Sequence, residues 1–128
     1  MSTASLRARY LGDQITTASP QRLLVMLYDR LTLDLERAHT ALTAGDREAA
    51  NVQLQHAQEI VLELHSSLRV EMWDGGPRLA AIYTWLHAEL VKANMRGNAR
   101  IVADCQRIVE PLREAWREAA ASLAPSPA

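Results

Sequence analysis

Four segments of this chain place apolar residues at alternating three- and four-residue steps, and helix-breaking residues interrupt the pattern between them. That spacing puts the apolar side chains on one face of an α-helix. The four stripes are Leu24, Leu27, Leu31, Leu35, Ala38 and Leu42; Ala50, Leu54, Ala57, Val61, Leu64 and Leu68; Leu79, Ile82, Leu86, Leu90 and Ala93; and Ile101, Cys105, Ile108, Leu112, Ala115 and Ala119. Strong helix formers dominate and β-branched alternation is missing, so the chain is predicted to be all-α.

The residues between the stripes predict where each helix begins and ends. A Ser or Asp is a good N-cap, Pro suits a first helical turn, and Gly enters the left-handed conformation that ends a helix. Such residues stand at Ser19 and Pro20, Gly45 and Asp46, Asp74 to Pro77, and Gly97 and Asn98. Links this short make consecutive helices antiparallel neighbours. We therefore predict an antiparallel, up-down-up-down four-helix bundle over residues 19–123.

The segments outside the bundle carry their own signals. Residues 1–18 place Leu6, Tyr10, Leu11 and Ile15 at helical spacing, which predicts a short N-terminal helical or extended segment. If the bundle has an apolar groove that binds another protein, its client, this segment could cover the groove when no client is bound. Residues 124–128 contain two prolines and are predicted to be a frayed, disordered tail.

Pro111 interrupts the fourth stripe. Because proline lacks the N–H that would bond the carbonyl of Arg107, the segment is either two short helices or one kinked helix. The apolar stripe keeps its phase on both sides of Pro111, which favours the kinked helix.

Charge and cysteine usage exclude several classes of protein. The 14 Lys and Arg residues and 15 Asp and Glu residues are mixed along the chain, whereas nucleic-acid binding requires a basic cluster. Cys105 has no second cysteine with which to form a disulfide. No secretory signal and no apolar run of about 18 residues is present. The sequence predicts a cytoplasmic protein with no membrane span.

Enzymatic alternatives find little support. Glu36 and His39 form one Glu-x-x-His pair, but a di-iron bundle needs two such pairs. Ala38, His39 and Thr40 resemble the start of a histidine phosphotransfer motif, yet the Lys and Gly that should follow are replaced by Ala41, Leu42 and Thr43. The four histidines lack zinc-site spacing. We predict no enzyme, no cofactor and no metal, with a phosphotransfer domain as the enzymatic alternative.

Large apolar residues also occur off the four stripes: Leu23, Val25, Ile60, Leu62, Trp85, Val91, Val102, Val109 and Trp116. They either widen the core faces and add scattered surface contacts, or line grooves for amphipathic segments of another chain. The second interpretation predicts a protein that binds a client, as a chaperone or as a helical adaptor or regulator.

Several runs resemble the flagellar export chaperone FliS. They are Tyr10; residues 15–20; Leu23, Leu24 and residues 26–29; residues 57–61 with Glu63 and Leu64; Tyr83, Trp85 and Leu86; Leu90, Ala93 and Asn94; and residues 112–116. The resemblance extends in order and spacing along nearly the whole chain. It implies a four-helix bundle that holds flagellin before export.

The resemblance also implies partners and a mode of binding. The client would be the disordered C-terminal segment of flagellin, whose premature polymerisation is prevented before delivery to the type III export apparatus. The export gate component FlhA and the regulator FliW are further candidate partners. The chain itself is expected to be a monomer or a weak homodimer. The predicted partner-binding residues are Tyr10, Ile15, Ile60, Leu64, Trp85, Asn94, Val102, Val109 and Trp116. Asn94 is either a helix C-cap or a hydrogen-bond partner of the client backbone.

Overall fold

The computed structural model describes residues 19–72 and 74–123, and every regular element in these residues is helical. The elements are α2 (Pro20–Thr43), α3 (Arg47–Ser67), the 3-10 turn η1 (Val70–Met72), α4 (Gly76–Arg96) and α5 (Ala99–Leu123). The all-α prediction is confirmed. The predicted N-terminal segment 1–18 and tail 124–128 lie outside the described residues.

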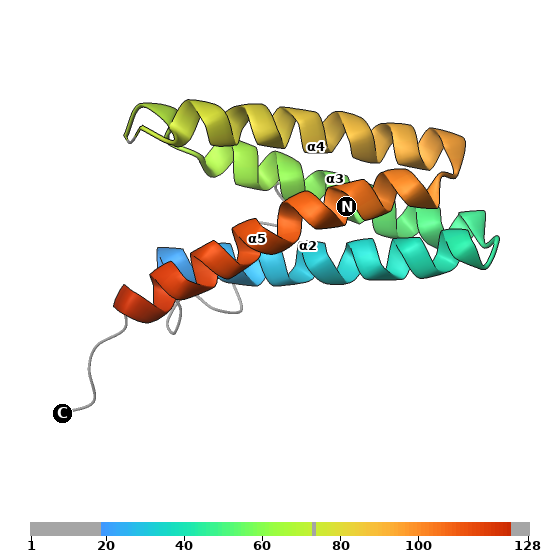
Figure 1. Cartoon of the computed structure of the whole chain (residues 1–128), viewed down its shortest axis with the longest axis horizontal. Helices are drawn as coiled ribbons and strands as arrows, with labels where there is room; N and C mark the ends of the chain where they lie inside the picture. The colour runs from blue at the N-terminus through green and yellow to red at the C-terminus, as the bar shows by residue number, and fades with distance from the viewer. Residues whose placement is uncertain (1–18, 73, 124–128) are drawn as a thin grey trace.

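The four helices form a closed bundle in which each contacts its two neighbours. Helix α2 packs on α3 and α5, α3 packs on α4, and the contact between α4 and α5 is the least extensive of the four. In Figure 1, α5 begins beside the C-terminal end of α4 and then inclines toward α2. Consecutive helices run antiparallel, so the up-down-up-down four-helix bundle is confirmed. Among the described helices, none combines the length and apolar character that spanning a membrane requires.

Three of the predicted helix boundaries are confirmed by their capping bonds. The Ser19 hydroxyl accepts a hydrogen bond from the Arg22 amide at 3.2 Å, and an Asp46 carboxylate oxygen accepts from the Ala49 amide at 3.0 Å. Asn98 accepts from the Arg100 amide at 2.9 Å. These side chains satisfy amides that the first turn of a helix leaves without an intrahelical partner.

The link between α3 and α4 differs from the prediction. Helix α3 ends at Ser67 rather than at Asp74, and η1 occupies part of the connection. The first residue of α4, Gly76, is buried against this turn, and a Cβ placed there would lie 2.3 Å from the Val70 carbonyl oxygen. Glycine is therefore required at position 76, because the backbone of Val70 leaves no room for a side chain. From the sequence alone, the Gly75–Gly76 pair is equally consistent with a simple turn.

The core contains the predicted stripes of α2, α3 and α4, but α5 presents a different face. Its fully buried residues are Val102, Cys105 and Val109, whereas Ile108 is 39% exposed. The packing of α2 and α4 turns Val102 and Val109, which were predicted to lie off the core stripe, inward beside the predicted core residue Cys105, and it leaves Ile108 at the surface.

Helix α5 continues without a break across Pro111. The interpretation as two short helices is wrong, whereas a kink at Pro111 stays a prediction. Pro111 itself is exposed.

Candidate functional site

Two large apolar side chains remain exposed where α4 and α5 adjoin. Trp85 of α4 is 40% exposed and Ile108 of α5 is 39% exposed. Ile82, Ile101 and Leu112 are half-buried against the core, and Ala115 is exposed. We call this set, Ile82, Trp85, Ile101, Ile108, Leu112 and Ala115, the α4–α5 flank.

Helical geometry places these residues along one seam. Ile101, Ile108 and Ala115 recur every seven residues and share one side of α5, and Ile82, Trp85 and Glu89 share one side of α4 at steps of three and four. Glu89 and Lys92 lie close enough to Cys105 of α5 to influence the pKa of its thiol. That side of α4 therefore faces α5.

Charged pairs also lie beside the apolar residues of the flank, beyond Trp85 on α4 and between Ile101 and Ile108 on α5. Lys92 pairs with Glu89 at 3.0 Å on α4, and Arg107 pairs with Asp104 on α5. The surface thus combines exposed apolar residues, Trp85 and Ile108, with charged pairs beside them, and an amphipathic helix has the complementary composition.

Four of the residues predicted to bind a partner lie in the core. Ile60, Leu64, Val102 and Val109 are at most 2% exposed. The expectation that Ile60, Val102 and Val109 lie off the core is wrong. The stripes of α3 and α5 are wider than the regular heptad positions, because each of these helices packs against two neighbours at once. None of the four contributes to the surface of the closed bundle.

The other predicted residues have different positions. Trp85 is on the α4–α5 flank, and Trp116 is half-buried against the core. Tyr10 and Ile15 lie outside the described residues. The flank residue Ile108 was assigned to the core stripe by sequence reasoning. The signal that could have identified it is the presence of a second, equally apolar stripe on α5.

Asn94 is not a helix C-cap. Gly97 ends α4 in the left-handed conformation, with φ at 62°, and the Asn94 side-chain amide donates to the Asn51 oxygen of α3 at 2.7 Å. Arg47 donates to the main-chain carbonyl of Asn94 at 3.0 Å. The residue ties α3 to the end of α4, and a contact between Asn94 and a client stays a prediction.

A buried aromatic cluster joins three helices beneath the surface. The hydroxyls of Tyr28 and Tyr83 lie 2.7 Å apart, and the Trp116 indole N–H hydrogen-bonds the Tyr28 hydroxyl. Burial raises the pKa of both phenols, and hydrogen bonds from Tyr83 and Trp116 oppose that rise for Tyr28. The cluster is thus a neutral hydrogen-bonded centre.

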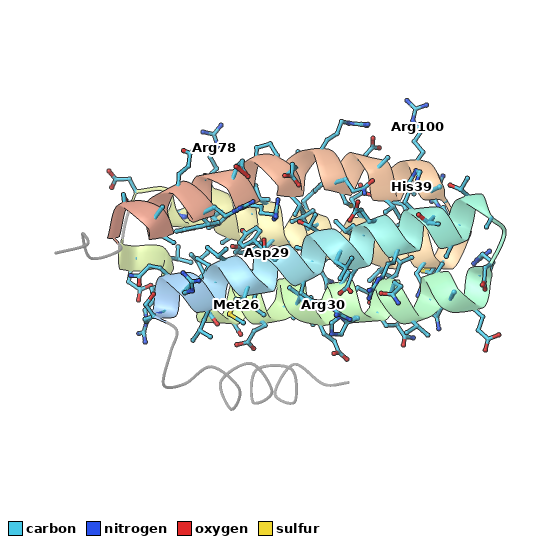
Figure 2. The ribbon with its side chains drawn as sticks, turned by 90° about the horizontal axis from the view of Figure 1, so that it is seen from below. Met26, Asp29, Arg30, His39, Arg78 and Arg100 are labelled. Carbon is cyan, nitrogen blue, oxygen red and sulfur yellow. The ribbon has the colours of Figure 1, made fainter. Side chains whose placement is uncertain are left out.

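A buried acidic residue of α2 was not identified from the sequence. Asp34 of α2 is fully buried, contacts the His56 ring nitrogen of α3 and pairs with Arg30 at 3.1 Å. Desolvation raises the pKa of its carboxyl despite the attraction of His56 and Arg30. In Figure 2, Arg30 lies on the side of α2 that faces α3, and Asp29 lies on the side that faces α5.

The described residues offer little for catalysis. Burial raises the pKa of the Cys105 thiol to about 12, so this side chain is a poor nucleophile. Within residues 19–72 and 74–123, no three His, Cys, Asp or Glu side chains come together as metal ligands.

The model of the family described as flagellar protein FliS matches residues 2–123. The chain belongs to the FliS family. It is 29% identical to the flagellar secretion chaperone FliS of Bacillus subtilis over 110 residues, which cover 86% of this chain and 82% of the relative. It is 30% identical to the FliS chaperone of Campylobacter jejuni, with coverage of 85% and 86%, and 30% identical to that of Salmonella typhimurium, with coverage of 81% and 78%. FliS is a chaperone family, since these relatives are named flagellar secretion chaperones.

Proposed function

We propose that this FliS-family protein is a cytoplasmic export chaperone that binds the disordered C-terminal segment of flagellin. Binding would prevent premature polymerisation and assist delivery to the flagellar type III export apparatus. Family membership supports the class of client, because the relatives are flagellar secretion chaperones. The observation that carries the docking site is the exposure of Trp85 and Ile108 on facing sides of α4 and α5.

An amphipathic helix suits this surface. The flank runs along two antiparallel helices. An amphipathic client helix lying along it would place apolar side chains at positions i, i+3 or i+4 and i+7 against the flank. A disordered segment becomes helical only when its apolar face is covered, so folding and binding would occur together. The bound flagellin segment could then no longer join a growing filament.

The flank alone is too small for tight binding. Trp85 and Ile108 are already more than half covered, and complete burial of a large apolar side chain contributes only about 1.5–3 kcal/mol. Submicromolar affinity requires more than about 8 kcal/mol net, and ordering the client costs at least about 2–5 kcal/mol. The client must therefore contact more of the bundle than the flank.

Further contacts of the chaperone are proposed from the family resemblance. FlhA would receive the chaperone–flagellin complex at the export gate, and FliW would be a regulatory partner. Without a client, the protein would be a monomer or a weak homodimer, because the flank leaves apolar surface available for self-association.

Titration calorimetry tests the proposal. Full-length flagellin should bind with a large negative heat-capacity change, as expected for coupled folding and burial, and flagellin truncated at its C-terminus should not bind. Undiminished binding of the truncated protein would instead favour an adaptor with a different client segment.

The position of the client can be tested through the single lysine of the chain. Lys92 lies two helical turns from Trp85 on α4 and is the sole lysine in the sequence. A bound client on the α4–α5 flank should slow acylation of Lys92 by an amine-reactive reagent. The truncated flagellin provides the matched control, and equal acylation rates with both flagellins would place the client elsewhere.

A further inference from the structure

Helix α5 is held differently on the two sides of Pro111. Among its residues 99–122, the fully buried ones are Val102, Cys105 and Val109, and all three precede the proline. After the proline, the best-covered side chains with a described environment, including Leu112 and Trp116, are only half-buried. We call residues 112–123 the α5 arm. Most of the apolar burial that fixes α5 to the bundle therefore lies outside the arm.

Pro111 weakens the connection between the arm and the rest of α5. Proline has no main-chain N–H, so the carbonyl of Arg107 lacks the hydrogen bond that would normally cross this point. A helix bends most readily where such a bond is missing. The position of Pro111, directly after the last buried residue of α5, places this weak point at the edge of the well-packed region.

Two specific interactions hold the arm against α2. The Arg113 Nε donates to the Asp29 carboxylate at 2.7 Å, and the Trp116 indole bonds the Tyr28 hydroxyl. Because α2 and α5 are antiparallel, the arm beyond Arg113 lies opposite the start of α2. The half-buried Leu24 and Leu27 stand on that part of α2.

We propose that the α5 arm is a hinged strap that opens about Pro111 and admits the client to the apolar surface beneath it. Opening breaks the contacts of Arg113 and Trp116 with α2 and uncovers Tyr28, together with Leu24 and Leu27. This extends the binding surface beyond the α4–α5 flank, which by itself is too small. The inference rests on the proposed function for the identity of the client, a C-terminal flagellin segment. The apparent affinity then depends on the open fraction, because only the open form is fully competent to bind.

Hydrogen exchange in the free, full-length protein tests the hinge without any client. In the double variant D29N/W116F, amides of residues 112–123 should exchange about five- to tenfold faster, since a partly exposed ion pair and one buried hydrogen bond are lost. The variant E114Q breaks only the Glu114–Arg117 pair inside the arm and should exchange like the wild type. P111A restores the missing bond and should slow exchange at least about threefold. Equal exchange in all four proteins would overturn the hinge.

Association kinetics with full-length flagellin then test the role of the arm. The rate constant should rise in D29N/W116F and fall in P111A by the same factors as the exchange rates, and it should not change in E114Q. If the exchange rates shift as expected but association does not follow them, the arm is not an entry route for the client. If no variant binds flagellin, wild type included, the proposed function is wrong, although altered exchange would still establish the hinge.

Discussion

The phenolic oxygens of Tyr28 and Tyr83 lie 2.7 Å apart in the interior and join α2 to α4, the two helices that face each other across the bundle diagonal. Each is at most 1% exposed. Two polar groups in an apolar core are tolerated because each satisfies the other. The pair also defines the register of α2 against α4, since a shift of either helix by one turn would break this hydrogen bond and leave the Tyr83 hydroxyl buried without its partner.

Removing one hydroxyl should cost more than removing both. Y83F leaves the Tyr28 hydroxyl buried without its tyrosine partner, so we expect a loss of about 1–3 kcal/mol in the free energy of unfolding. In the double variant Y28F/Y83F this penalty for Tyr28 disappears, and the loss should be smaller than the sum of the two single losses. Urea denaturation with an unchanged m-value measures this. Strictly additive losses would show that the hydroxyls do not interact.

Stability should fall in alkaline solution. Burial raises the pKa of the Cys105 thiol from 9.0 to about 12, so its contribution is complete below pH 9 and is lost as the pH rises toward 12. Within this window the thiol should contribute about 1.4 kcal/mol per pH unit to the decline. Urea titrations of the wild type and C105A from pH 8 to 11 should therefore converge as the pH rises. Parallel curves would mean that the thiol titrates normally in the folded state.

Asp34 predicts a second pH effect. Desolvation raises the pKa of the Asp34 carboxyl in the folded state above its value of 3.8 in the unfolded chain, so folding favours the neutral form. The free energy of unfolding therefore decreases as the pH rises above 3.8 and the folded protein must bury a charged carboxylate. The variant D34N has no proton to lose at this position. The stability of D34N relative to the wild type should therefore increase between pH 3.5 and pH 7. A relative stability that decreases over this range would show that His56 and Arg30 outweigh desolvation.

Two glycines with left-handed backbones provide a matched comparison. Gly97 has φ of 62°, and a Cβ there would lie 2.5 Å from the Arg47 guanidinium, whereas Gly45 has φ of 78° and open space around it. G45A should cost about 1–2 kcal/mol from backbone strain alone. G97A should cost more, because Arg47 must also leave the carbonyls at the end of α4. Thermal unfolding of both variants measures the difference, and equal losses would contradict a structural role for Arg47.

Client binding should depend on exposed rather than buried apolar residues. W85A should weaken flagellin binding by about tenfold or more, as for an aromatic anchor, while stability changes by less than about 1 kcal/mol. V52A removes an exposed apolar residue of α3, 58% exposed, and should leave binding unchanged. I60A should instead cost about 2–5 kcal/mol of stability, because Ile60 is fully buried. Calorimetry with flagellin and urea denaturation separate the effects, and unchanged binding in W85A would exclude this part of the flank.

The sequence was sufficient for the helices and for most of their ends. Capping residues such as Ser19 and Asp46 act within one turn, so their role is encoded locally and the structure confirms it. The end of α3 was predicted seven residues too late. Gly76 was assigned to a turn, whereas its close contact with Val70 depends on how the link folds back onto α4.

The candidate site was predicted less well than the fold. Trp85 was correctly expected to be accessible, but Ile60, Val102 and Val109 were expected outside the core and are buried. Burial depends on which side of a helix its neighbours cover, and a single helix with two apolar stripes does not carry that information. The Tyr28–Tyr83 contact joins residues 55 positions apart and has no local signature either.

By itself, the sequence determined the all-α class, the order and direction of the helices, and the capping of most ends, because these depend on spacing and on interactions within a few residues. Tertiary packing alone decided which face of α5 became core, which apolar side chains stayed exposed on the α4–α5 flank, and how weakly the α5 arm is buried. Those properties depend on which face of each helix its neighbours cover, and this is defined only when all four helices pack together.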